Sequence, residues 1–173
     1  MELKDFDFHL PEELIAQRPL PERDSSRLMV LSRGKKSVEH KLFRDILQYL
    51  KEGDLLVLND TRVIPTRLTG VKPTGGRTEL LLVERLAGDG EEWKCLAKPT
   101  KGLKTGSRLL FEGIEAEVTG FDDEGLVRCA FNGRLDLKAI GKVPLPPYIK
   151  REAGVEDTSR YQTVFAGNDG AVA

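Results

Sequence analysis

The stretch Gly53-Asp54-Leu55-Leu56-Val57-Leu58-Asn59-Asp60-Thr61-Arg62-Val63 governs the interpretation of this chain. Its apolar run, Leu55 to Leu58, does not alternate with polar residues, which is typical of a strand buried on both faces of a sheet. In open α/β sheets, ligands bind beyond the carboxyl ends of such strands. We therefore expect the polar residues that follow, Asn59 to Arg62, at the mouth of a site.

The same polar residues have a simpler explanation. Asn, Asp and Thr side chains often hydrogen-bond the nearby backbone in turns, and Arg62 is then an ordinary surface charge. Taken alone, the four residues favour this structural interpretation.

Composition indicates a globular protein of one or two domains. The chain has 173 residues, of which 39% are apolar and 32% charged. No apolar run reaches the length of a membrane span, and the amino terminus lacks signal-peptide character, so no membrane is expected. The only cysteines, Cys95 and Cys129, are far apart in sequence, which predicts two free thiols in the core and a cytoplasmic location. No Cys/His cluster has metal-ligand spacing, so no metal is expected either.

Positive charge is concentrated in the middle of the chain. Residues 61–151 carry 16 basic and 12 acidic side chains, whereas residues 1–60 and 152–173 are both net negative. Five basic residues around a predicted hairpin loop have no acid among them between Trp93 and Glu112: Lys94, Lys98, Lys101, Lys104 and Arg108. Such a loop either binds nucleic-acid phosphates or is a solvated loop rich in lysine, and the two interpretations carry equal weight.

The segment before Asn59 predicts an α/β layer. Leu28 to Leu31 has the character of a strand, which turns at residues 33–35. Apolar residues at helical spacing predict an amphipathic helix over residues 42–51, with Gly53 as its stop. Because that helix leads into the strand at 55–58, a strand, a helix and a strand follow one another closely, as in α/β layers.

After Arg62 the pattern changes to short strands separated by glycine-rich turns. The expected strands are 63–68, 78–85, 93–97, 107–111, 116–121 and 126–131. This spacing indicates a small antiparallel barrel or sandwich. The pair Gly75-Gly76 could let the backbone approach a ligand, but a hairpin turn is the favoured explanation. Residues 135–140 are expected to form a brief helix.

The end of the chain is expected to return to the first domain. Residues 143–149 are too rich in proline for a central strand and indicate a rigid strap. A short helix capped by Asp or Thr is expected within 157–165, and residues 170–173 end the chain without a closing strand or helix. We therefore predict a layered α/β domain in 1–61, an inserted β-barrel in 62–143 and an incomplete return into the α/β domain in 144–173, in a chain truncated at its C-terminus.

Several of these stretches occur together in one family. They are Leu10-Pro11-Glu12-Glu13-Leu14-Ile15-Ala16-Gln17-Arg18-Pro19, Arg23-Asp24 with Ser26-Arg27-Leu28, Gly53 to Val63, Pro65 with Arg67-Leu68, Thr74-Gly75-Gly76, Val143-Pro144-Leu145-Pro146-Pro147-Tyr148-Ile149 and Arg160-Tyr161-Gln162-Thr163-Val164. On these residues the chain closely resembles the S-adenosylmethionine:tRNA ribosyltransferase-isomerase family of queuosine biosynthesis. Phe165 departs from the family pattern, where tyrosine is expected. Family members also continue past Ala173, so any site residues there, including a histidine, are absent from this chain.

The resemblance implies a two-domain protein and a reaction. The ribosyl group of S-adenosylmethionine is transferred and isomerised onto the aminomethyl-deazaguanine at the tRNA wobble position, which gives epoxyqueuosine, adenine and methionine. S-adenosylmethionine is then a substrate, and no metal or redox cofactor is needed. The implied partners are tRNA and S-adenosylmethionine, and a monomer is expected. Two alternatives remain open, namely a non-catalytic tRNA-binding module and an inactive fragment.

The implied chemistry suggests roles for particular residues. A base must accept a proton during attack by the substrate amine, and Asp60 is the best carboxylate for that work or for holding cationic substrates. Arg62, the other catalytic candidate, and Arg27 suit bidentate binding of phosphate or carboxylate. The other substrate-binding candidates are Asn59 and Thr61 for ribose hydroxyls, Tyr148, Tyr161 and Gln162 for base stacking and edge recognition, and Gly75 and Gly76 for close backbone approach.

Overall fold

The computed structural model describes residues 1–170. The chain divides into two compact units, one made of residues 1–57 and 147–151, the other of residues 58–146 and the segment from 152 onward. The domain boundaries expected at 61/62 and 143/144 remain a prediction.

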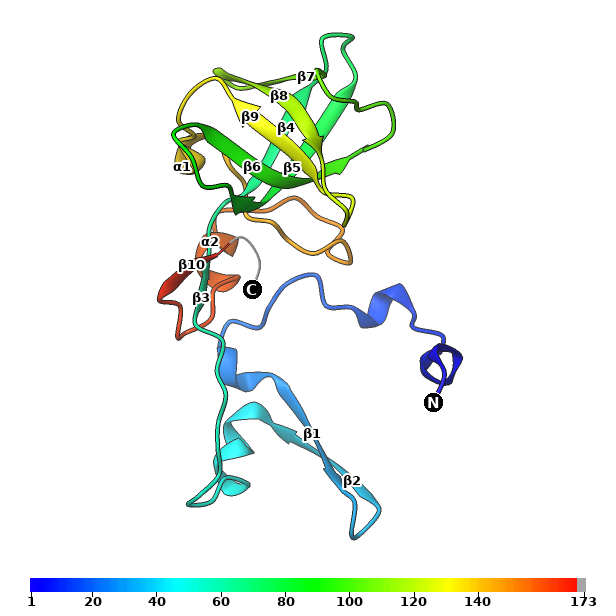
Figure 1. Ribbon diagram of the computed structural model, residues 1–173. Coiled ribbons are helices and arrows are strands. Elements are labelled where there is room, and N and C mark those ends of the chain that lie inside the picture. Colours follow the sequence, from blue (N-terminus) through cyan, green and yellow to red (C-terminus); the bar gives the residue numbers. More distant parts are fainter. Residues whose placement is uncertain (171–173) are drawn as a thin grey trace. The chain divides into compact units, whose positions relative to one another are not determined.

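The second unit is built on a closed antiparallel barrel with the strand order β4-β5-β6-β9-β8-β7 (Figure 1). Its strands are β4 (Arg67–Val71), β5 (Arg77–Arg85), β6 (Glu91–Lys98), β7 (Arg108–Phe111), β8 (Ile114–Phe121) and β9 (Val127–Phe131). Alternate side chains point inward, as on β5, where Thr78, Leu80 and Leu82 are buried. Because the barrel is closed, each of its strands is hydrogen-bonded to a neighbouring strand on both edges. The small antiparallel barrel expected from the sequence is thus confirmed.

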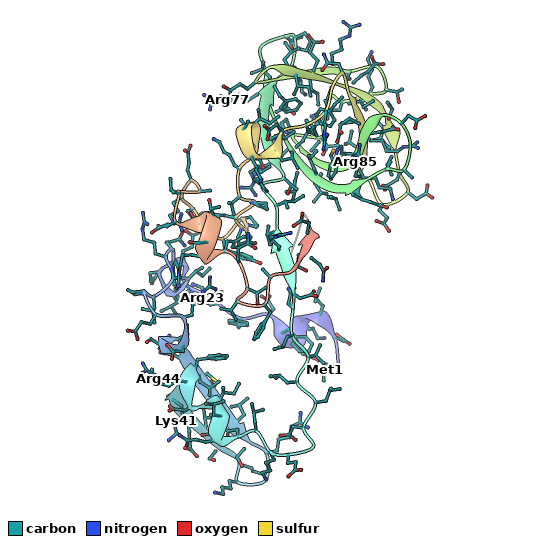
Figure 2. The ribbon with its side chains drawn as sticks, turned by 90° about the vertical axis from the view of Figure 1, so that its left-hand side faces the viewer. Met1, Arg23, Lys41, Arg44, Arg77 and Arg85 are labelled. Carbon is teal, nitrogen blue, oxygen red and sulfur yellow. The ribbon has the colours of Figure 1, made fainter. Side chains whose placement is uncertain are left out.

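The barrel interior is the core of the protein (Figure 2). Its fully buried aliphatic side chains include Leu68, Leu80, Leu82, Leu109, Val118 and Val127. Cys95 and Cys129 lie among them as free, fully buried thiols, which confirms their predicted role as small core residues. The hydrogen bond to Cys129 and burial of its own thiol raise the pKa of Cys95, and the same hydrogen bond lowers the pKa of Cys129.

The hairpin between β4 and β5 explains the Gly75-Gly76 pair. Gly75 has φ of 86°, a left-handed conformation that glycine adopts without strain. Its N–H donates to the Lys72 carbonyl at 2.8 Å, and the Lys72 N–H donates to the Gly76 carbonyl at 2.7 Å. The hairpin-turn interpretation of this pair is therefore confirmed.

Four short elements complete the second unit beside the barrel. They are β3 (Thr61–Val63), β10 (Asn168–Gly170), α1 (Leu137–Ile140) and α2 (Asp157–Arg160). The brief helices expected near residues 135–140 and 157–165 are confirmed, but the expected Asp or Thr cap of the second is wrong, because its N-cap residue is Glu156, whose side chain does not cap it. Strand β10 pairs in parallel with β3, so the expectation that the chain ends without a further strand is wrong, although residues 171–173 lie outside the described range. The single strand expected over 63–68 is divided, because Pro65 has no N–H to donate to a sheet.

The first unit contains a hairpin and short 3₁₀ helices. Strands β1 (Arg27–Ser32) and β2 (Ser37–Leu42) pair in antiparallel fashion, which confirms the predicted strand at 28–31 and its turn. The 3₁₀ helices of this unit are η1 (Leu3–Phe6), η2 (Glu12–Leu14), η3 (Arg23–Ser25) and η4 (Phe43–Gln48). Figure 2 labels Lys41 and Arg44, which mark the end of β2 and the start of η4.

Two predicted elements of the α/β layer are wrong. Residues 55–58 form no strand, and Leu55 and Val57 are 89% and 83% exposed. A buried strand needs partners on its edges and cover on its faces, and no strand within residues 1–170 pairs with this run. The helix expected over 42–51 is only the 3₁₀ helix η4, because short amphipathic helices depend on packing of their apolar face, and Leu47 is 75% exposed.

Candidate functional site

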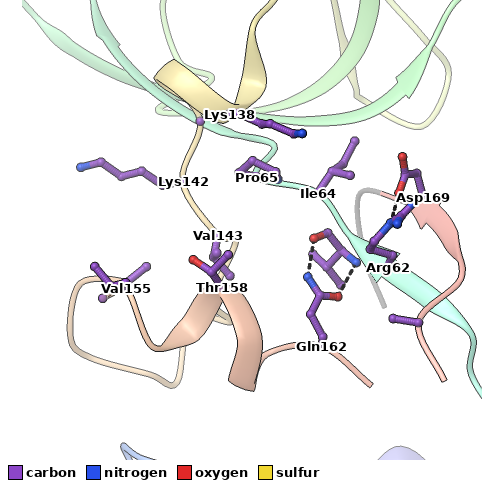
Figure 3. Close-up of a pocket in the computed structure, with 15 residues that line it drawn as sticks. Arg62, Ile64, Pro65, Lys138, Lys142, Val143, Val155, Thr158, Gln162 and Asp169 are labelled. Carbon is purple, nitrogen blue, oxygen red and sulfur yellow. Dashed lines mark hydrogen bonds and ion pairs between the residues drawn. The ribbon is translucent and has the colours of Figure 1, made fainter. Parts of the chain in front are cut away.

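A cavity of the second unit has a volume of about 750 Å³, within the range of small-ligand pockets (Figure 3). We call it the basic pocket. Its lining residues are Arg62, Val63, Ile64 and Pro65 from β3 and the link to β4, Lys138, Gly141, Lys142 and Val143 from α1 and the residues after it, Ala153, Gly154, Val155, Thr158 and Gln162 around α2, and Ala166 and Asp169 near β10. Segments distant in sequence thus surround one space.

Gln162 fixes one wall of the basic pocket. The Val63 N–H donates to Gln162 Oε1 at 2.8 Å, and Gln162 Nε2 donates to the Val63 carbonyl at 2.7 Å (Figure 3). The side-chain amide therefore pairs with Val63 much as a neighbouring strand would. Because this bonding engages both ends of the amide, Gln162 acts in this structure as a clamp on β3, and its role in recognising a base edge stays a prediction.

Arg62 and Asp169 form an ion pair across the two parallel strands. The residues are direct register partners on β3 and β10, and Arg62 Nε lies 2.5 Å from Asp169 Oδ1. Both side chains are more than half exposed, so solvent screens the attraction. The pair nevertheless cancels one positive and one negative charge at the pocket.

A glycine allows α1 to approach the link between β3 and β4. Gly141 follows α1 directly, and its N–H donates to the Leu137 carbonyl at 3.0 Å. A Cβ at this position would collide with the Pro65 carbonyl oxygen and crowd that of Leu137. Next along the chain, Lys142 exchanges two backbone hydrogen bonds with Arg67 at the start of β4. These contacts place Lys138 and Lys142 at the pocket.

Lys138 and Lys142 are site residues that the sequence analysis missed. Both line the pocket, and within residues 1–170 neither side chain forms an ion pair. Thr158 and Asp169 at the same pocket were missed as well. A usable signal was the four-residue spacing of the two lysines at the end of the net-positive segment.

Asn59 and Asp60 lie just before β3 and do not line the basic pocket. The Thr61 N–H donates to Asn59 Oδ1 at 2.8 Å, which confirms the turn interpretation for Asn59. The Asp60 carboxylate accepts a hydrogen bond from Asn168 Nδ2 at 2.6 Å, and its carbonyl accepts one from the Gly167 N–H at 2.7 Å. Asn59 and Asp60 thus precede the short strand β3. The expectation that they follow a buried strand at residues 55–58 is wrong.

The remaining predicted substrate-binding residues are dispersed. Tyr161 is half-buried at the end of α2 and does not line the basic pocket, and Gly75 and Gly76 lie in the β4–β5 turn. Arg27 and Tyr148 belong to the first unit. There Tyr148 lines a cavity of about 460 Å³ together with Glu12, Glu13, Ile15, Gln17, Pro147 and Lys150.

The predicted basic loop joins β6 to β7, which do not pair with each other in the barrel, so the expectation of a hairpin loop is wrong. Lys98, Lys101, Lys104 and Arg108 are all exposed in or beside it, and Lys72 from the β4–β5 turn donates to the Lys101 carbonyl at 3.4 Å. Lys94 differs from them, because it lies on β6 and pairs with Glu84 at 2.7 Å. That hydrogen bond raises the pKa of Lys94. The structure thus leaves four of the five predicted basic residues without a carboxylate partner in the described part of the chain.

Within residues 1–170, no three His, Cys, Asp or Glu side chains are grouped so that they could hold a metal ion. None of the helices in this range is long and apolar enough to cross a membrane.

The sequence profile of the queuosine biosynthesis protein family matches residues 3–173. The chain therefore belongs to this family, whose sequence pattern extends through both units. Among its relatives is the S-adenosylmethionine:tRNA ribosyltransferase-isomerase of Syntrophotalea carbinolica, 53% identical over 178 residues that cover 100% of this chain and 52% of the relative. The protein of the same name from Pelobacter propionicus is 50% identical over 179 residues, with the same coverage.

The chain spans about half the length of these curated relatives. A crystal structure of the S-adenosylmethionine tRNA ribosyltransferase from Thermotoga maritima is also similar in sequence, with 45% identity. The match covers 73% of this chain and 44% of that one, with a TM-score of 0.36.

Proposed function

We propose that this chain takes part in an S-adenosylmethionine:tRNA ribosyltransferase-isomerase reaction of queuosine biosynthesis. The observation that carries the proposal is identity of 50% or more, over the whole chain, with relatives of that name. The substrates would be S-adenosylmethionine and a tRNA bearing aminomethyl-deazaguanine, and the products epoxyqueuosine in the tRNA, adenine and methionine. No further cofactor is part of the proposal.

The reaction makes demands that residues near β3 can meet. The sulfonium acidifies the adjacent ribosyl carbon, and the attacking amine must lose a proton, so a general base is needed. Asp60 is exposed and bound at one oxygen by Asn168, which leaves the carboxylate accessible. Arg62 lies two residues further along, at the basic pocket. We assign Asp60 to proton transfer or to opposing the sulfonium, and Arg62 to anion binding through the guanidinium nitrogens that do not pair with Asp169.

The barrel supplies a surface for the RNA. The exposed basic residues of the β6–β7 loop, with Lys72 beside them, concentrate positive charge where no described carboxylate pairs with it. Contacts with phosphates position a nucleic acid without reading its sequence. The same observation supports a second candidate function, a tRNA-binding module without catalytic activity.

The test is a turnover assay with tRNA that carries the aminomethyl-deazaguanine. Adenine and methionine release and the mass of the modified nucleoside are measured by chromatography and mass spectrometry. The assay uses this chain and, in parallel, a protein that continues it to the length of its relatives. We expect both small products and the modified nucleoside from the longer protein. Binding of tRNA without S-adenosylmethionine binding or product would favour the binding module, and no binding of either substrate would reject both functions.

A further inference from the structure

The charge of the basic pocket restricts what it can hold. Four charged side chains line it, and two of them, Arg62 and Asp169, neutralise each other. The others, Lys138 and Lys142, have no carboxylate partner within residues 1–170. The nearby Asp157 carboxylate is buried and accepts a hydrogen bond from the Gly154 N–H at 2.7 Å, and it does not line the pocket. The field in the pocket is therefore positive.

The rest of the lining is mainly apolar. Its apolar residues include Ile64, Pro65, Val143, Val155 and Ala166, of which Val143 is buried and Val155 is 94% exposed. In Figure 3 the Lys138 side chain runs along the barrel side of the pocket with its ammonium end toward Ile64, while Lys142 extends to the opposite side. The two ammonium ends therefore supply positive charge on two opposite sides of the pocket.

We propose that the basic pocket binds a nucleotide of the RNA substrate, with its two flanking phosphates at Lys138 and at Lys142 and its base or sugar against the apolar lining. This inference rests on the proposed function. S-adenosylmethionine fits the pocket poorly on charge, because it carries a carboxylate, an ammonium and a sulfonium and is a net cation. Two unpaired lysines repel a cation and attract a phosphate diester. The cationic substrate therefore binds elsewhere.

The experiment compares two double variants of the whole chain that lose the same charge. Lys138→Gln with Lys142→Gln removes both pocket lysines. Lys35→Gln with Lys51→Gln removes two exposed lysines of the first unit that have no ion pair in the described range, and serves as the matched control. Affinity for a short RNA stem–loop is measured against salt concentration, S-adenosylmethionine affinity by calorimetry, and folding by thermal melting.

We expect the pocket variant to flatten the slope of log affinity against log salt by about 0.7–0.9 for each phosphate that the two lysines neutralise in the unmodified chain. The control should keep the slope, and S-adenosylmethionine affinity should not fall in either. A neutral variant, Ala153→Leu, adds volume to the pocket lining and should weaken RNA binding without changing the slope.

Two results would overturn the inference while leaving the proposed function intact. They are an unchanged slope in a folded pocket variant and a selective decrease of its S-adenosylmethionine affinity. Failure of the unmodified chain to bind RNA also overturns this assignment, and the accompanying turnover assay then shows whether the proposed function falls with it.

Discussion

Asp60 has two candidate roles, one as a structural hydrogen-bond acceptor and one as a chemical group in the reaction. Its backbone carbonyl and its carboxylate both accept hydrogen bonds from the segment that leads into β10. An asparagine could accept the same hydrogen bond from Asn168 through its amide oxygen. The Asp and Asn side chains are similar in size and differ mainly in the negative charge, so Asp60→Asn tests the chemical role alone.

We expect Asp60→Asn to fold normally and to reduce single-turnover product formation by about 10²–10⁴-fold, the usual cost of removing a general base. The protein assayed is the one that continues this chain to the length of its relatives. Asp54→Asn is the matched control, because the Asp54 carboxylate likewise accepts a hydrogen bond, in its case from the backbone N–H of Lys51 at 2.8 Å. If Asp60→Asn keeps its melting temperature and stays within about threefold of the unmodified rate, well short of a base's contribution, Asp60 is a structural residue.

The buried thiol of Cys95 predicts a dependence of stability on pH. Its pKa is raised above the ordinary value of 9.0 by the hydrogen bond to Cys129 and by burial. Below that value both folded and unfolded chains keep the proton. Above it the unfolded thiol ionises while the folded one does not. Ionisation lowers the free energy of the unfolded state, so the free energy of unfolding falls.

Urea denaturation at about pH 8 and about pH 10, either side of the thiol's ordinary pKa, measures this effect. We expect the fall in stability between the two pH values to be smaller in Cys95→Ala than in the unmodified chain. Val118→Ala, which also truncates a fully buried side chain, should keep the larger fall. Equal pH dependence in all three proteins would show that the Cys95 proton is not linked to folding.

At the scale of elements, the contact between α1 and the β3–β4 link depends on one glycine. Because a Cβ at Gly141 would collide with the Pro65 carbonyl, Gly141→Ala must move α1 or the link. We expect a decrease of about 1–3 kcal/mol in the free energy of unfolding, as for other overpacking substitutions. Gly90→Ala is the control, since nothing lies within 4 Å of the added Cβ. Chemical denaturation of both variants gives the comparison, and equal stability would mean that the close approach is not required.

The β6–β7 loop predicts a salt-dependent contribution to RNA affinity. Replacing Lys98, Lys101, Lys104 and Arg108 together by Gln should flatten the slope of log affinity against log salt by about 0.7–0.9 per phosphate bound. Lys94→Gln should change it much less, because Lys94 is already paired with Glu84. RNA-binding titrations over a range of salt concentrations test this prediction. If the variant with all four residues replaced keeps the slope, the loop is not part of the RNA interface.

The elements predicted correctly are those whose partners are close in sequence. Strands β5 and β6 alternate buried with more exposed positions and are joined by a short turn. Their alternating apolar and polar residues therefore indicate strands with one buried face. The run at 55–58 has no such neighbour, and a strand cannot form without a partner. The pocket lysines were missed for a related reason. Lys138 reaches the site only through the approach of Gly141 to Pro65, a tertiary contact that no local pattern indicates.

At the scale of the whole molecule, the described chain leaves much apolar surface uncovered. In the first unit, Met29, Leu31 and Val38 of the hairpin and all of Leu55 to Val57 are more than half exposed. Exposed apolar surface of this kind is typical of an interface or of aggregation. The chain also spans about half the length of its relatives. Both observations bear on whether these residues suffice for catalysis.

We therefore expect the purified chain of residues 1–173 to form no modified tRNA, even where it binds RNA. Its candidate carboxylate, Asp60, and its candidate anion site, the basic pocket, belong to one unit, whereas two other predicted substrate-binding residues, Arg27 and Tyr148, belong to the other. A protein continuing the chain to the length of its relatives should restore turnover and bury residues 55–57, seen as slower hydrogen exchange at their amides. Intact mass confirms that the shorter sample is uncontaminated by longer protein. Sustained turnover by that verified sample would show that residues 1–173 already contain a complete active site.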